Sequence, residues 1–336
     1  MTEEATPASE ITPASHRLAT TRMAHVASKY GTIIALLVLI LVFSVLKTSL
    51  FFTSSNFVNI ASDVAIGSII ACGLTIPLVA NEFDLSIGYV ASFAGVLVTG
   101  FMLKQGMSLP LAIVATLGVC ALIGLLNGLI ITGLAVNSFV ATLGTGTVIV
   151  GMDFFYSNGV AFSVGLPQTF FNLNLTKILG IPLPVYIALG VAIILWIVLN
   201  RSLFGYYAQA IGQNAEATRL VGVRVNRVRV MAMMVSSVCA GIGGILLAAE
   251  LGSGQVSSGD SYLLSGFAAA FLGSVALRDA EFHIVGTVIG VITVGVAFNG
   301  LAIVGAPTFW QYIVQGGLLI GAVALSTVGR KVLASR

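Results

Sequence analysis

Ten long apolar segments follow one another along this 336-residue chain, and they limit the folds that it can adopt. Each is close to the roughly 20 residues that a helix needs to cross a bilayer, and all are too long for the strands of a membrane barrel. The segments are 31–51, 60–80, 86–103, 109–134, 139–157, 183–200, 228–251, 262–277, 284–304 and 308–327. Only 8% of the residues are charged, against about a quarter in a soluble domain. The sequence therefore predicts an all-α integral membrane protein with about ten transmembrane helices.

The Lys and Arg residues predict the orientation of the chain, because basic loops cross membranes poorly. With a cytoplasmic N-terminus, ten crossings leave twelve of the fifteen Lys and Arg residues in the cytoplasm. Residues 1–28 are rich in Thr, Ser, Ala and Glu, which predicts a disordered cytoplasmic tail. We expect the transmembrane domain to span 29–330 and a short cytoplasmic tail to follow at 331–336.

Residues 81–88 interrupt apolar sequence with two carboxylates, Glu82 and Asp84, ahead of Ser86 and Gly88. Ionisable groups at membrane depth cost several kcal/mol unless they face a cavity or a partner. One interpretation is a broken or re-entrant helix whose second half begins near Ser86 and presents unpaired amides to a polar solute. The other is a cytoplasmic turn in which Asp84 caps the next helix. The first makes Glu82, Asp84 and Ser86 candidates for a substrate pathway.

Two groups of four segments, 60–157 and 228–327, suggest two loosely repeated halves. Three other acids, Asp63, Asp153 and Glu250, lie toward the ends of apolar segments, and we expect them at an interface or between paired helices. The sequence shows no central Lys or Arg in a span for an anion and no carboxylate cluster for a cation. It therefore predicts a neutral, polar cargo.

The loop 201–227 carries a short helical pattern between two apolar segments. Asn214 is a suitable N-cap, Glu216 stands in the favourable first turn, and Gly222 is a stop signal. A partly apolar cytoplasmic helix on a membrane protein has little to pack against except another protein. The alternative is that the arginines here only fix the topology.

Several chemistries lack support in this sequence. There is no G-x-x-x-x-G-K-[ST] motif, so we expect no ATP hydrolysis by this chain. The three histidines have no metal-ligand spacing, and no Ser/His/Asp set stands out. Nucleic-acid binding has no support beyond the arginines of the loop. We expect neither catalytic residues nor a metal site, and no nucleic-acid partner.

Four motifs resemble those of a known family. Residues 82–88 (E-F-D-L-S-I-G) are similar to a G-x-x-D-L-S-V-G element, and residues 137–145 (N-S-F-V-A-T-L-G-T) to P-S-F-I-A-T-L-G-T. Residues 204–223 are similar to a cytoplasmic coupling loop, and residues 286–290 (G-T-V-I-G) to a G-T-x-x-G helix start. Over about 31–330, the chain resembles the membrane permease subunit of bacterial ABC importers of the ribose/xylose/simple-sugar family.

The chain departs from this family's pattern at three positions. Asn81 and Tyr206 replace the usual Gly and Arg of the first and third motifs. Ser265 stands where ribose-type members carry an acid, which bears on the substrate.

The resemblance implies a homodimer of permeases in the lipid of the bacterial inner membrane. It also implies a cytoplasmic ABC ATPase, which uses ATP and Mg²⁺, and a periplasmic or lipid-anchored sugar-binding protein. It adds Asn137 and Thr142 to the pathway candidates. Contacts with the ATPase are expected at Gly205, Gly212, Asn214, Glu216, Ala217, Arg219 and Gly222.

The function predicted from the sequence is ATP-driven import of a neutral sugar or polyol through a subunit that is not itself an enzyme. The alternative is an ion-coupled secondary carrier of a small polar solute. An intramembrane enzyme is a third hypothesis, for which the sequence offers no reactive constellation. Loss of the ATPase distinguishes the first two, because it would stop the importer and leave the carrier active.

Overall fold

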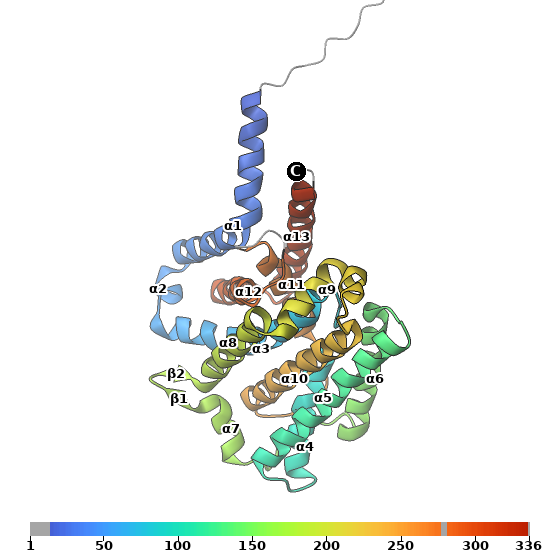
Figure 1. The fold of residues 1–336 in the computed structure, drawn as a ribbon. Coiled ribbons are helices and arrows are strands. Elements are labelled where there is room, and N and C mark those ends of the chain that lie inside the picture. Colours follow the sequence, from blue (N-terminus) through green and yellow to red (C-terminus); the bar gives the residue numbers. More distant parts are fainter. Residues whose placement is uncertain (1–13, 277–280, 335–336) are drawn as a thin grey trace, which may run out of the picture.

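The computed structural model describes residues 14–276 and 281–334, and it is built almost entirely of helices (Figure 1). The helices are α1 (Ala14–Leu46), α2 (Thr48–Phe51), α3 (Ser54–Val79), α4 (Ile87–Leu103), α5 (Leu109–Gly133), α6 (Ser138–Ser157), α7 (Gln168–Leu175), α8 (Leu183–Arg201), α9 (Leu203–Leu220), α10 (Val225–Leu251), α11 (Ser261–Ser274), α12 (Ile284–Val304) and α13 (Phe309–Ala334), and a small hairpin joins β1 (Lys177–Ile178) to β2 (Ile181–Pro182). Within the described residues, six helices are long and apolar enough to cross a membrane, and four more are shorter and apolar. The predicted all-α membrane class is confirmed.

The bundle has two ends, which we call the α9 side and the α7 side. Figure 1 shows α9 toward one end, and α7 with the β1–β2 hairpin toward the other. Helix α3 ends on the α9 side, because Val79 contacts Gly212 of α9. Helices α4 and α6 both end on the α7 side, where Lys104 Nζ donates to the Tyr156 carbonyl at 2.6 Å.

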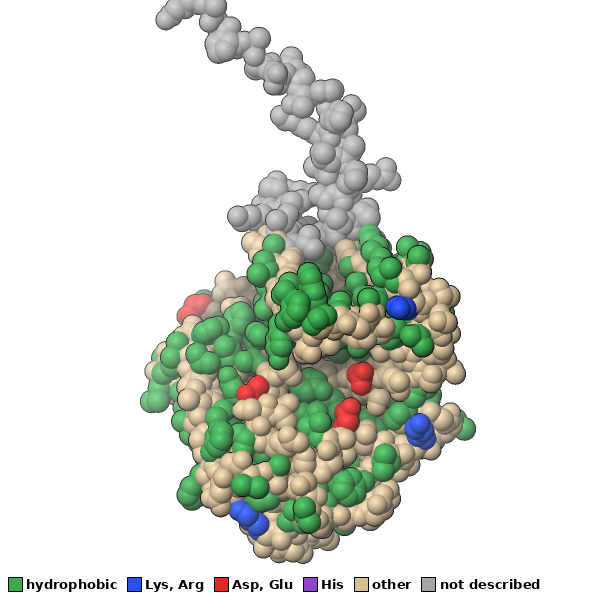
Figure 2. Space-filling view, turned by 180° about the vertical axis from the view of Figure 1, so that it is seen from behind, with side chains coloured by type: hydrophobic (Ala, Val, Ile, Leu, Met, Phe, Trp, Pro, Cys, Tyr) green, Lys and Arg blue, Asp and Glu red, His purple; other side chains and the backbone are tan. Residues whose placement is uncertain are grey.

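Helix α10 lies at the centre of the bundle and packs closely on its neighbours. A Cβ at Gly244 would lie 2.0 Å from the Ala91 carbonyl oxygen of α4, and one at Gly124 of α5 would lie 2.6 Å from the Met233 carbonyl oxygen of α10. Lipid gives little hydrophobic drive for helix pairing, so such close backbone contact stabilises the bundle. Large apolar side chains cover much of the outer surface, as expected for a surface in contact with lipid (Figure 2).

The ends of the chain differ from the sequence prediction. Residues 1–13 lie outside the described residues, but α1 begins at Ala14, so the prediction of disorder up to residue 28 is wrong from there on. Pro13 precedes this helix, and no Gly or Pro interrupts it before Gly31. At the other end α13 continues to Ala334, so most of the predicted tail 331–336 is helical.

The first apolar segment also differs from its prediction as one span over 31–51. Helix α1 ends at Leu46, and the separate helix α2 follows Lys47. Lys47 leaves the helical conformation, with φ −146° and ψ 54°.

Two helices begin inside the bundle. The chain leaves the helical conformation near 81–88, as both interpretations of this segment predict, since α3 ends at Val79 and α4 begins at the buried Ile87. The second break was not predicted: after α10 ends, residues 252–260 run back along α4, with Gly254 against Thr99 and Gly259 against Gly88. Thr99 and Gly88 are about 16 Å apart along a helix. Helix α11, with 14 residues, therefore starts well inside the bundle and is shorter than the span predicted from hydropathy.

Candidate coupling helix and translocation pathway

Asp84 lies in the break between α3 and α4, and its buried carboxylate is hydrogen-bonded on both oxygens. Ser86 donates to Oδ1 from its backbone nitrogen at 3.0 Å and from Oγ at 2.6 Å. Ser236 of α10 donates to Oδ2 from Oγ at 2.7 Å, and Asn127 of α5 donates to Ser86 Oγ at 2.9 Å. A buried carboxylate is tolerated when its oxygens are satisfied in this way. We call this set of four side chains the Asp84 network.

The rest of the break is fastened to α6 and α10. The Leu85 backbone nitrogen donates to Thr142 Oγ1 at 2.9 Å, and Arg229 Nε lies 2.8 Å from Glu82 Oε1. Asn137 is exposed and caps α6 by accepting from the Phe139 backbone nitrogen at 2.9 Å. The chain also reverses direction here, because α3 ends on the α9 side and α4 ends on the α7 side. This geometry favours the turn interpretation, in which Asp84 secures the start of the next helix.

The five predicted pathway residues do not share one surface. Glu82, Asp84, Ser86 and Thr142 come together around the break. Asn137 is exposed at the cap of α6, next to Ser138, whose Oγ accepts from the Phe83 backbone nitrogen at 3.1 Å. None of them lines the large cavity described below. Their role in a substrate pathway stays a prediction.

Two glycines explain how α9 is held against the bundle. A Cβ at Gly212 would lie 2.1 Å from the Val79 carbonyl oxygen at the end of α3. A Cβ at Gly205 would lie 2.1 Å from the Leu199 carbonyl oxygen near the end of α8. Both contacts are backbone to backbone, so a displacement of α9 is passed directly to two transmembrane helices.

The second part of α9 is a separate short helix, as the sequence predicts. Asn214 leaves the helical conformation, and its Oδ1 accepts from the Ala217 backbone nitrogen at 2.9 Å. Gly222 ends the turn with φ +88°, a conformation that favours glycine. The predicted cap and stop are therefore confirmed.

The outer face of this short helix is free of contact with the described chain. Ala217 is exposed, and Glu216 and Arg219 form an exposed ion pair at 3.3 Å. Leu220 and Val221 beside them are 82% and 78% exposed. Apolar side chains exposed next to a charged pair are typical of a docking surface.

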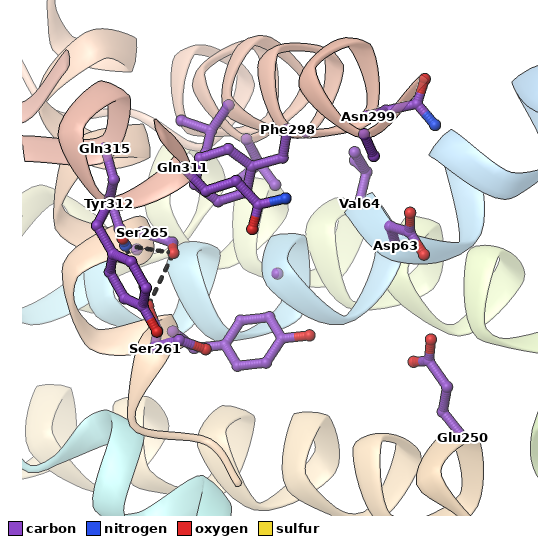
Figure 3. A pocket seen from close by; sticks show the side chains of 17 residues that line it. Asp63, Val64, Glu250, Ser261, Ser265, Phe298, Asn299, Gln311, Tyr312 and Gln315 are labelled. Carbon is purple, nitrogen blue, oxygen red and sulfur yellow. Dashed lines mark hydrogen bonds between the residues drawn. The ribbon is translucent and has the colours of Figure 1, made fainter. Parts of the chain in front are cut away.

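A cavity of about 480 Å³ lies between α3, α10, α11, α12 and α13, toward the α7 side (Figure 3). Figure 3 shows the carboxylates of Asp63 and Glu250 pointing toward one another across this space. Neither makes a hydrogen bond or an ion pair with the described residues. The space-filling view of this protein shows a hollow in the surface with acidic side chains beside it (Figure 2).

The other wall of the cavity is polar as well. Gln315 of α13 donates from Nε2 to Ser265 Oγ at 2.8 Å and to the Ser261 carbonyl oxygen at 3.3 Å, which ties α13 to the start of α11 (Figure 3). The rings of Tyr262, Phe298 and Tyr312 also line the cavity. Ser265, one of the three positions at which the chain departs from the family pattern, is thus part of this wall.

The cavity corrects two expectations from the sequence. Asp63 and Glu250 face open space, which excludes helix pairing, one of the two roles expected for them, and leaves an interfacial position a prediction. They also form a pair of carboxylates where no cluster was expected. The sequence did indicate these two residues, because each carboxylate interrupts an apolar segment. Their proximity depends on the packing of α3 against α10, which no local pattern encodes. Among the described residues, no three His, Cys, Asp or Glu side chains gather closely enough to hold a metal ion.

Comparison with known proteins places the chain in a family. Residues 56–323 match the family described as branched-chain amino acid transport system / permease component. The chain belongs to this family of transport permeases. The permease is 35% identical to the ribose import permease protein of Bacillus subtilis over 89% of its own length and 93% of that protein.

Two further relatives are named for other sugars. The permease is 31% identical to the L-arabinose transport system permease protein of Escherichia coli, over 90% of its own length and 92% of the relative. It is 30% identical to the D-allose transport system permease protein of the same species, over 88% and 91%. No solved structure matches it. The resemblance to permeases of bacterial ABC sugar importers is confirmed, and the permease is a multi-pass protein of the bacterial inner membrane.

Proposed function

We propose that this permease is the membrane-spanning subunit of an ABC importer that carries a neutral sugar or polyol into the cell. An extracytoplasmic binding protein delivers the cargo, and a separate ATPase drives its passage. The observation that carries the proposal is the exposed short helix at the end of α9, which follows directly on a first part held against α8 and α3 by backbone contacts at Gly205 and Gly212. Relatives named for the import of three sugars, each matched over about nine-tenths of the chain, support the cargo class.

In this proposal the ATPase docks on the α9 side, which is cytoplasmic. Five arginines on or beside α9 support this orientation under the positive-inside rule: Arg201, Arg219, Arg224, Arg227 and Arg229. Both chain termini are then cytoplasmic as well. ATP and Mg²⁺ are used by the ATPase, so this chain binds no cofactor and is not an enzyme. Movement of α9 shifts the ends of α3 and α8, which act as rigid levers between two arrangements of the bundle.

The α7 side then faces outward and receives the binding protein. Helix α7 is anchored by the buried Phe170, whereas Val164 and Leu179 nearby are almost fully exposed. These two side chains offer apolar contact to a partner or to lipid headgroups. We further propose that two copies of the permease form a homodimer, since two ATPase chains acting together require two docking helices.

An ion-coupled secondary carrier remains the alternative, and one observation favours it. Asp63 and Glu250 face the cavity without a basic partner among the described residues, and carboxylates in a membrane often bind coupling ions. The two functions differ in their source of energy.

Reconstitution into vesicles separates the two candidates. Permease, ATPase and binding protein from the same genome are assembled in proteoliposomes, and uptake of labelled D-ribose, L-arabinose and D-allose is measured. The proposal predicts uptake that needs hydrolysable ATP and survives ionophores. Uptake that persists without the ATPase and collapses with the ion gradient would establish the carrier instead.

A further inference from the structure

We infer that the cavity between Asp63, Glu250 and the start of α11 binds one uncharged polyhydroxylated molecule during its passage from the α7 side. This inference rests on the proposed importer function and adds a binding site to it. The cavity is large enough, because its 480 Å³ lies within the roughly 300–1,000 Å³ typical of small-molecule pockets.

The polar groups of the cavity match the hydroxyls of such a molecule. Carboxylates accept hydrogen bonds through two oxygens each, and those of Asp63 and Glu250 are free to accept, since neither is bonded to another described residue. Asn299 is not one of these groups, because its amide points away from the cavity and donates to Asn56 at 3.0 Å (Figure 3).

The apolar part of the cavity matches the faces of a sugar ring. Tyr262 and Tyr312 stand among the lining side chains together with Phe298. Aromatic faces pack well against C–H groups while the hydroxyls at the edge of a ring reach polar partners. Carboxylates on one wall and aromatic rings with a Gln on another form the mixed lining that a polyol requires.

The charge of the cavity argues against an amino acid as its ligand. The described residues that line it include two carboxylates and no Lys, Arg or His side chain. The α-carboxylate of an amino acid would therefore have no cationic partner and would meet two like charges. The preference for an uncharged ligand distinguishes this site from one for the branched-chain amino acids after which the matched family is described.

The position of the cavity in the bundle agrees with a transport role. Its floor is the start of α11, a helix that begins inside the bundle after the connection 252–260. Transporters commonly place their substrate near such interrupted helices, where backbone can rearrange. Asp63 and Glu250 stand above this floor toward the α7 side, on the route from outside.

The first test measures transport by the assembled importer carrying Asp63→Asn together with Glu250→Gln. Both changes keep side-chain size and remove the negative charge. Uptake of the sugar that the wild type transports should fall at least about tenfold, the factor that corresponds to about 1.4 kcal/mol. ATP hydrolysis stimulated by the binding protein should persist, because α9 is untouched. The matched control is Glu281→Gln, which removes an exposed carboxylate outside the cavity and should leave uptake unchanged.

The second test detects occupancy directly and does not depend on the carboxylate variants. The three native cysteines are buried, so Ser261→Cys introduces one accessible thiol into the cavity wall. A membrane-impermeant thiol reagent should label it, and the transported sugar at high concentration should slow the labelling several-fold. L-leucine should give no protection. Thr169→Cys on the exposed face of α7 is the control and should be labelled at the same rate with or without sugar.

The outcomes separate this inference from the proposed function. If the wild type takes up no sugar with ATP, or takes up L-leucine instead, the proposed function fails. If it takes up sugar while the double variant does so equally well and sugar does not protect Cys at position 261, the cavity is not the binding site. Protection by Na⁺ alone, without sugar, would also overturn the inference, because the carboxylates would then hold a cation.

Discussion

The two places where carboxylates enter the membrane domain differ in what surrounds them. Asp84 is fully buried, and both of its oxygens accept hydrogen bonds from Ser86 and Ser236. Asp63 and Glu250 have no partner among the described residues and face an open cavity. A polar group that is satisfied by the fold stabilises the fold, whereas one left unsatisfied at a cavity is available to a ligand. The role of an ionisable residue in an apolar segment can therefore be assigned only when its hydrogen-bond partners are known.

The largest effect is expected from Asp84→Ala, which removes the carboxylate whose oxygens are both hydrogen-bonded. The change leaves Ser86 and Ser236 without their acceptor in a buried site, and hydrogen bonds to a charged group contribute about 1.5–3 kcal/mol each. We expect a loss of roughly 3 kcal/mol or more, seen as a lower melting temperature or loss of folded protein in detergent. Ser236→Ala, which removes one of these bonds, should cost less. Equal stability of Asp84→Ala and the wild type would contradict the structural role.

The next effect concerns how α9 rests on α3. Alanine normally stabilises a helix relative to glycine by up to about 1 kcal/mol. At Gly212 the new Cβ would overlap the Val79 carbonyl oxygen, so Gly212→Ala should cost about 1–3 kcal/mol and reduce ATP-driven uptake. Gly118 of α5 has nothing within 4 Å of its Cβ position, and Gly118→Ala should be neutral or stabilising. The sign of the difference between these two variants tests the packing of α9.

A smaller effect is expected at the edge of the break from Glu82→Gln. The ion pair with Arg229 is intermediate in burial, since the Glu82 and Arg229 side chains are 8% and 26% exposed. Its loss should cost about 1–2 kcal/mol, between the values for exposed and buried pairs. A melting temperature that matches that of Asp84→Ala would show that the whole break acts as one unit. No change would limit the structural role to the Asp84 network.

The smallest effect on stability is expected from Glu216→Lys on α9. The pair with Arg219 is exposed, and such pairs contribute at most about 0.5 kcal/mol. Melting should therefore be unchanged, while ATPase binding and uptake should be lost through reversal of a charge on the docking surface. Co-purification of the ATPase with the variant measures this. Normal binding together with normal uptake would remove the assignment of α9 as the coupling helix.

The sequence was informative where structure depends on local pattern. Span boundaries follow from hydropathy, and the ends of α4 and α12 agree with prediction to within a residue. The cap at Asn214 and the stop at Gly222 follow from residue type. Hydropathy does not report depth, so the return of residues 252–260 into the bundle was missed. That path depends on Gly259 fitting against the backbone of α4.

In the candidate sites too, the sequence indicated the residues but not their tertiary contacts. Glu82 and Asp84 were recognised because charges are rare in these segments, but the sequence did not reveal that Ser236, far along the chain, satisfies Asp84. Asp63 and Glu250 were noticed for the same reason, and their shared cavity arises only from the packing of five helices. Tertiary contacts, rather than residue type, distinguish a carboxylate that holds the fold from one that is open to cargo.

The most direct test of this distinction measures uptake and melting temperature on the same preparations of two variants. One carries Asp63→Asn with Glu250→Gln, and the other carries Asp84→Asn. We predict that the first loses uptake per assembled complex while its melting temperature stays that of the wild type, and that the second melts at a lower temperature. The opposite result, normal uptake in the first and lost uptake at unchanged melting temperature in the second, would place the pathway at the break and contradict this account.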